Sequence, residues 1–155
     1  MMMTPIIVRM SLLIILGLVG AVTTSAQRAN SFQGEWEWAI YAKSRDELPP
    51  MYRNERLKDV PAAAVYLKLK QRGNKLTGEY SASRRYLAKL EDGELDAIVN
   101  KKTARLELTS GFGGNITVLL TPRGNQLRWK MIKSEGEHYF PDDVVLHRVV
   151  RNKRR

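Results

Sequence analysis

Polar and apolar residues alternate along most of the chain after its first thirty residues. The clearest stretch is residues 64–80, AVYLKLKQRGNKLTGEY, where Val65, Leu67 and Leu69 fall on one face of an extended chain. A period of two is typical of half-buried strands. Residues 72–75, Arg-Gly-Asn-Lys, tolerate the positive φ angles of a tight turn, so this stretch predicts a β-hairpin.

The same alternation predicts further strands on both sides of this hairpin. They cover residues 33–41, 94–100, 104–108, 116–120, 127–131 and 144–150. No helical stretch is long enough to cover a sheet. The expected fold is therefore all-β, an antiparallel up-and-down meander of seven or eight strands. Such a meander avoids exposed edges most completely by closing on itself, which favours a small barrel over a sandwich.

One segment departs from the alternation. Residues 43–62, KSRDELPPMYRNERLKDVPA, are rich in charge and contain three prolines. This composition predicts a long loop after the first strand, with one helical turn at residues 53–58. Long loops in compact domains are often functional, but a solvated connector is an equally good interpretation.

The N-terminus carries an export pattern. Met10–Ala21 is an apolar run of the kind found in signal peptides, and it is short for a membrane span. The small residues Thr24, Ser25 and Ala26 follow it at the positions that a signal peptidase reads. We therefore expect a signal peptide over residues 1–26 and one domain over residues 27–155. The protein would be periplasmic or extracellular, without a transmembrane segment in the mature chain. An uncleaved membrane anchor is the alternative.

The charge of the chain favours anionic partners. It has 26 Lys and Arg residues against 16 Asp and Glu residues, a net charge of +10. Removal of the signal peptide takes only Arg9, which leaves 25 basic and 16 acidic residues, or +9. Such a charge suits lipopolysaccharide phosphates, acidic glycans or extracellular nucleic acid, with no specific nucleic-acid recognition. The chain contains no Cys, so neither a disulfide nor lipid attachment at a cysteine is available.

Two groups of basic residues are candidates for polyanion binding. The first is the C-terminal tail, with Arg151, Lys153, Arg154 and Arg155. The second consists of cations at outward strand positions, namely Lys68, Lys70, Arg105, Arg128 and Lys130. These five would join the tail in one basic face if their strands were neighbours.

Catalytic chemistry has little support in the sequence. The two histidines are His138 and His147, and no Ser or Thr lies in a recognisable nucleophile motif. The acidic stretch at residues 134–143, SEGEHYFPDD, has no standard metal-ligand spacing and is interpreted as a solvated loop. We expect no catalytic residue, no metal and no cofactor, and therefore not an enzyme.

The glycine-rich stretch Ser110–Asn115 has two interpretations. In the simpler one, its glycines permit positive φ in a hairpin. In the other, Phe112 at the tip inserts into the cleft of a protein partner. This second arrangement resembles the periplasmic inhibitors of lysozyme, which are small barrels with a Ser-Gly-rich loop. A charge of +9 argues against a basic lysozyme as the partner.

The first and last strands resemble those of calycins, the group that includes lipocalins and avidins. The resemblance depends on Gly34 and Trp36 in the first strand, the long loop after it, the hairpin meander and Arg148 in the last strand. It implies that Trp36 packs across the closed end of a barrel against Arg148, and that Gly34 allows the strand to bend. The chain lacks the Thr-Asp-Tyr turn, C-terminal helix and disulfide of lipocalins. Its second half, Gly111 through Arg148, is also similar to short exported bacterial proteins.

Two functions remain open at this point. The first is a calycin-like carrier of a small apolar or amphipathic ligand, with the inward residues Tyr80, Leu106, Val118 and Trp129 as the walls of its cavity. The second is an interaction protein of the cell envelope, either a hydrolase inhibitor or a polyanion binder, which acts through its loops and outer surface. A barrel this small can also be filled completely by its own side chains, which would exclude a carrier.

The export pattern gives the first testable prediction. When the full-length gene is expressed in a Gram-negative host, the exported protein should begin at Gln27, because the Thr-Ser-Ala sequence ends at Ala26. Intact-mass measurement of the exported fraction checks this. A mature species that retains Met1 or the apolar run would contradict it.

Overall fold

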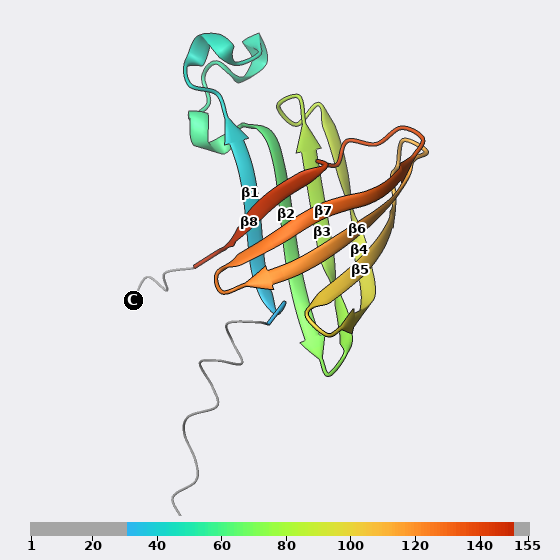
Figure 1. The fold of residues 1–155 in the computed structure, drawn as a ribbon. Helices are drawn as coiled ribbons and strands as arrows, with labels where there is room; N and C mark the ends of the chain where they lie inside the picture. The colour runs from blue at the N-terminus through green and yellow to red at the C-terminus, as the bar shows by residue number, and fades with distance from the viewer. Residues whose placement is uncertain (1–30, 151–155) are drawn as a thin grey trace, which may run out of the picture.

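The computed structural model describes residues 31–150, which form one closed barrel of eight antiparallel strands. The strands are β1 (Gly34–Tyr41), β2 (Pro61–Arg72), β3 (Lys75–Arg84), β4 (Lys89–Asn100), β5 (Thr103–Thr109), β6 (Asn115–Arg123), β7 (Gln126–Glu135) and β8 (Asp143–Arg148). Each strand pairs with the next in the chain, and β8 pairs back with β1 (Figure 1). The expected all-β up-and-down barrel is confirmed. Within residues 31–150, no helix is long and apolar enough to span a membrane.

The up-and-down order sorts the connections between the two ends of the barrel. The β2–β3, β4–β5 and β6–β7 turns lie at one end, which points downward in Figure 1. We call it the lower end. The described chain also begins and finishes there, since β1 starts and β8 stops at this end. The other four connections lie at the opposite, upper end.

The interior is filled by the apolar side chains that the alternation placed inward. Residues without solvent-exposed surface include Trp36, Val65, Leu67, Leu76, Leu106, Val118, Leu120, Leu127, Trp129 and Leu146. They belong to one continuous core that contains residues from all eight strands. Small residues make room for the two buried Trp side chains, among them Ala82, Ala97 and Ala104. An eight-stranded barrel is just wide enough for its side chains to fill it, and this barrel follows that rule.

The long loop between β1 and β2 contains three short 3-10 turns instead of the one helical turn expected at residues 53–58. They are η1 (Arg45–Glu47), η2 (Pro50–Tyr52) and η3 (Leu57–Asp59). Prolines break up longer helices because they lack an N–H donor, and Pro50 opens η2. The loop has its own small core of Ala42, Leu48 and Val60, against which Tyr52, Leu57 and Tyr86 pack. The loop is thus docked on the β3–β4 connection.

The β3–β4 connection is shorter than the sequence predicted, because β4 begins at Lys89 and not at residue 94. Three residues in a row, Arg85, Tyr86 and Leu87, have φ between 54° and 68°. Bulky residues rarely adopt this left-handed region unless the surrounding structure holds them there. Here the Tyr86 side chain packs into the small core of the long loop, and its backbone N–H donates to Ala62 O at 3.3 Å.

Candidate functional site

The lower end of the barrel is closed by Trp36 and Arg148, which are paired in the β1–β8 register. The Arg148 guanidinium carbon lies 4.1 Å from the centre of the Trp36 ring system. The Trp36 indole is fully buried and donates to Phe32 O at 2.7 Å. The guanidinium also donates to the backbone oxygens of Gln33 and Ser31, the latter at 3.2 Å. Partial burial lowers the pKa of Arg148 from its usual value. The cation-π contact and hydrogen bonds join the last strand to the start of the first.

Gly34 has a role that the sequence did not suggest, beside the strand bend expected there. A Cβ atom built on Gly34 would lie 2.3 Å from Nη1 of Arg148, far inside van der Waals contact. The φ of this residue is +134°, which L residues rarely adopt. Glycine is therefore needed here so that the guanidinium can approach the backbone of β1.

The four residues expected to line a ligand cavity lie in the filled core. Leu106, Val118 and Trp129 have no surface accessible to water, and Tyr80 is 8% exposed. A ligand large enough to replace water has no space beside the first three. Burial and the nearby carboxylates of Glu91 and Asp92 raise the pKa of the Tyr80 hydroxyl.

Phe140, from the β7–β8 connection, fills the upper part of the barrel. Its ring stacks on Trp129 with 5.9 Å between centroids and lies 5.7 Å from the ring of Tyr80. Three hydrogen bonds hold this connection over the barrel. Trp129 Nε1 donates to Pro141 O at 2.9 Å, the Arg84 guanidinium donates to Phe140 O at 3.3 Å, and Tyr139 N–H donates to Glu91 Oε1 at 2.7 Å. No pattern in the sequence predicts that an aromatic residue of this acidic loop lies inside the barrel.

The β7–β8 connection covers a place where β4 and β5 are not paired with each other. These strands are in register only next to their turn, where Val99 pairs with Ala104 and Asn100 with Thr103. Farther up, Tyr139 bridges the seam. Its N–H is bound by Glu91 of β4, and its ring contacts Phe112 of the β5–β6 connection.

Two buried polar atoms, one on β4 and one in this loop, lack hydrogen-bond partners within residues 31–150. Glu91 is only 4% exposed, and its second carboxylate oxygen, Oε2, is buried without a partner in residues 31–150. The Nδ1 atom of His138 is in the same situation. Buried polar atoms that go unpaired are costly, so this part of the barrel is the least well satisfied.

Phe112 packs against the protein surface. Its ring meets Tyr139 edge-on at 4.7 Å between centroids, and Lys89 Nζ lies 4.7 Å from the ring of Phe112 and 5.0 Å from that of Tyr139. Phe112 is 37% exposed. The loop is held by hydrogen bonds from Ser110 N to Gly114 O and from Phe112 N to Ser110 Oγ. The glycines build a tight connection, and Phe112 lies along its side in place of extending from a flexible tip.

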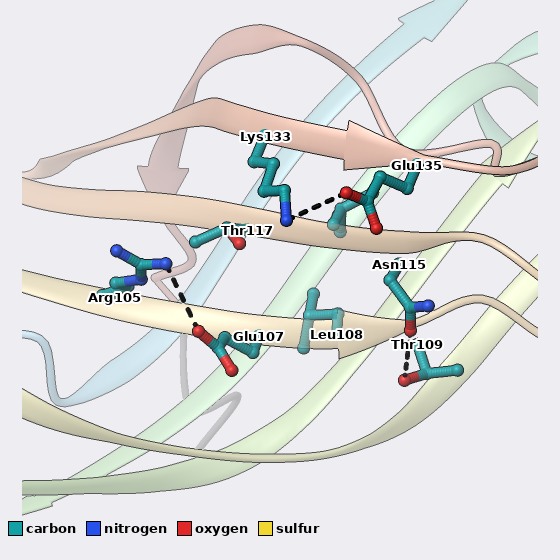
Figure 2. Close-up of a pocket in the computed structure, with 9 residues that line it drawn as sticks. Arg105, Glu107, Leu108, Thr109, Asn115, Thr117, Lys133 and Glu135 are labelled. Atoms are coloured by element: carbon teal, nitrogen blue, oxygen red, sulfur yellow. Dashed lines mark hydrogen bonds and ion pairs between the residues drawn. The ribbon is translucent and has the colours of Figure 1, made fainter.

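A shallow depression of about 340 Å³ crosses the outer face of β5, β6 and β7 (Figure 2). Arg105 pairs with Glu107 at 3.4 Å on one side of it, and Lys133 pairs with Glu135 at 2.9 Å on the other. Figure 2 shows the two ion pairs facing each other across the central strand. Since each cation is paired within its own strand, this surface offers no unpaired cation to an anionic ligand.

The single basic face expected from the outward cations is absent. Lys68 and Lys70 lie on β2, Arg105 on β5, and Arg128 and Lys130 on β7. None of these three strands neighbours another in the barrel. Acidic partners also occupy three of the five side chains. Besides the Arg105 pair, Lys68 lies 3.7 Å from Glu79, and Arg128 makes two hydrogen bonds to Asp143, which lower the pKa of that carboxyl group. The tail residues Arg151, Lys153, Arg154 and Arg155 lie outside the described residues.

A different group of cations gathers at the lower end. We call this group the basic rim, and it consists of Arg72 and Lys75 in the β2–β3 turn, Lys101 and Lys102 in the β4–β5 turn, and Arg123 in the β6–β7 turn. All five are exposed, and none of them forms an ion pair within the described part of the chain. The three turns contain no acidic residue over residues 71–75, 99–103 and 122–126.

Sequence reasoning missed the basic rim because it considered these turns only for their backbone geometry. The signal was nevertheless available in the connectivity. In an up-and-down meander every second turn lies at the same end, so three basic turns after alternate strands already imply one basic end.

Searches with the chain against protein-family models, curated proteins and solved structures find no match. The candidate function therefore depends on the geometry and charge of the barrel itself.

Trp36 gives the second prediction. Trp36→Ala should lower the free energy of unfolding by about 3 to 5 kcal/mol, because it leaves a large cavity and removes the platform beneath Arg148. Denaturant unfolding of residues 27–155 measures the change. The matched control is Trp38→Ala, on the same strand but only partly buried, which should cost less. A loss below about 1 kcal/mol for Trp36→Ala would show that this residue does not anchor the closed end.

Proposed function

We propose that the protein is a non-enzymatic binding protein of the cell envelope that attaches to anionic partners through the basic rim. The observation that carries this proposal is the presence of five exposed, unpaired cations on three turns of one barrel end, with no acidic residue among them. Cations that are not neutralised by neighbouring carboxylates create a positive potential that can attract and hold phosphate, sulfate or carboxylate groups.

The two chain ends extend this charge. Val149 N–H donates to Glu35 O at 2.9 Å, so the last described residues lie beside the start of β1 at the lower end. The sequence after residue 150 contains four cations at residues 151–155, and the sequence before residue 31 contains Arg28. These residues lie outside the described part of the chain and add to its positive charge.

The upper end has a mixed charge and supports the proposal by contrast. The loop at residues 43–60 carries five basic and four acidic residues, and Arg56 pairs with Asp59 at 2.6 Å. The β7–β8 connection adds Glu137 and Asp142. Charges of both signs at this end cancel over the distance at which salt screens them.

Polyanion attachment gives the third prediction. Replacing all five rim residues (Arg72, Lys75, Lys101, Lys102 and Arg123) with Gln should lower the salt concentration that elutes the protein from heparin beads by at least about half, because exposed charges dominate such binding. The matched control replaces five cations of the upper loop with Gln: Lys43, Arg45, Arg53, Arg56 and Lys58. Both variants lose the same charge, and only the rim variant should elute early. Equal elution of the two variants would contradict a role for the rim.

A carrier function is the second candidate, and one observation favours it. The upper barrel is filled by a loop residue, Phe140, and closed at the β4–β5 seam by another loop residue, Tyr139. Glu91 Oε2, next to this loop, and Nδ1 of His138, within it, are buried without a hydrogen-bond partner in the described part of the chain. A ligand that displaced Phe140 could satisfy these atoms, whereas in the described conformation no ligand fits beside Trp129.

The fourth prediction tests the carrier. Phe140→Ala should destabilise the fold by about 3 to 5 kcal/mol and open a cavity against Trp129. If the protein carries an apolar ligand, this variant should enhance the fluorescence of N-phenyl-1-naphthylamine more than the wild type does. Phe112→Ala serves as the control, because Phe112 lies on the surface. Absence of probe binding by both the wild type and a folded Phe140→Ala variant would exclude the carrier function.

A further inference from the structure

We infer that the basic rim docks the barrel end-on against the surface of an anionic lipid bilayer. This inference rests on the proposed function and names its partner. The chemistry recognised is a planar array of lipid headgroup phosphates.

The arrangement of the rim fits a plane better than a polymer strand. Its cations lie on three turns, which join β2 to β3, β4 to β5 and β6 to β7 around the barrel. They are therefore spread around the lower end, where a broad surface can approach them together. Figure 1 shows the three turns at this end. A single polyanionic chain is better held by a basic groove that follows its backbone.

The hollows on the outer wall do not provide such a groove. Two neighbouring depressions on the face of β2, β3 and β4 have volumes of about 320 and 400 Å³ and share Glu79 and Glu94 in their linings. These two carboxylates are directly opposite each other in the β3–β4 register. Asp92 and Asp96 lie on the same outward side of β4, at alternate positions.

The acidic wall also fixes the orientation. A barrel lying on its β3–β4 side would bring four carboxylates toward an anionic surface, which costs free energy. A barrel standing on its upper end would present mixed charge. Only the upright position on the lower end brings to the surface a group of unpaired cations without carboxylates among them, and it keeps the acidic wall away from the lipid.

Apolar residues near the rim suit a lipid surface. Ile98 is 60% exposed on the outside of β4 and pairs in register with Lys75 of the rim. Val150 is 79% exposed at the end of the described chain. Apolar side chains beside cations add favourable burial at the level of the headgroups.

With the lower end on the bilayer, the upper connections face away from the lipid. This side of the barrel includes Phe112, Tyr139 and Lys89.

The test is co-sedimentation of residues 27–155 with vesicles of phosphatidylglycerol and phosphatidylcholine in equal amounts, and with phosphatidylcholine alone. The wild type should bind only the anionic vesicles, and less tightly as salt rises. Each cation near an anionic membrane contributes about fivefold to partitioning, so the five-residue rim variant should bind at least about 100-fold more weakly. The upper-loop variant with the same charge loss should change by less than about tenfold.

Labels give an independent measure of orientation, since the chain has no cysteine of its own. Single variants Asn125→Cys in the lower β6–β7 turn and Met51→Cys in the upper loop carry a fluorophore. Lipids with a nitroxide on the headgroup should quench the first label and leave the second unquenched. This measurement does not depend on the multiple rim variant being folded.

Each outcome decides one of the two proposals. Quenching at Met51 and not at Asn125, or equal vesicle binding by the rim variant and the wild type, would overturn end-on docking. Rim-dependent binding to heparin without binding to anionic vesicles would also overturn it, while the proposed function would stand. Binding to neither would overturn both.

Discussion

The pairing of the first strand with the last holds the whole structure together. The β1–β8 ladder is short, with Trp36 opposite Arg148 and Glu37 opposite His147, whereas β2 and β3 pair along their full lengths. A short ladder contributes few backbone hydrogen bonds, so side chains must hold the seam. Arg148 does this by stacking on Trp36 and donating to the backbone of residues 31–33. Glycine at position 34 makes this approach possible.

Closure of the barrel also determines how charge is distributed. In a closed up-and-down barrel, the order of the strands determines the end at which each turn lies. The turns after β2, β4 and β6 meet at the end that Trp36 and Arg148 close. Their residues are Arg, Lys, Gly, Asn and Gln, with no carboxylate at the tips. A charged end thus arises from three turns that are distant in sequence, from Arg72 to Arg123.

The parts of this fold that could be predicted are those with local signals. Alternation gave the strands, turn residues gave the hairpin of β2 and β3, and the Gly-x-Trp pattern led to the contact with Arg148. The first half of β4 was missed because Lys89 and Glu91 are polar residues at inward positions, which is the opposite of the usual pattern. These polar residues are explained by tertiary contacts. Glu91 accepts a hydrogen bond from the backbone of Tyr139, and Lys89 lies over two aromatic rings. Likewise, no alternation in the sequence predicts that Phe140 enters the barrel, because this residue lies in a loop.

The same distinction separates the two candidate functions. Inward direction follows from alternation, and Tyr80, Leu106, Val118 and Trp129 do point inward, but direction says nothing about whether space remains between them. The space that remains depends on the combined volume of the two Trp side chains, the small Ala residues and the inserted Phe140. This volume can be judged only from the three-dimensional structure. With the interior occupied, recognition in this conformation must take place on the outside. There, the strand walls mix cations and carboxylates, which form ion pairs within a strand or between neighbouring strands. The cations of the basic rim have no carboxylate among them and are open to a partner.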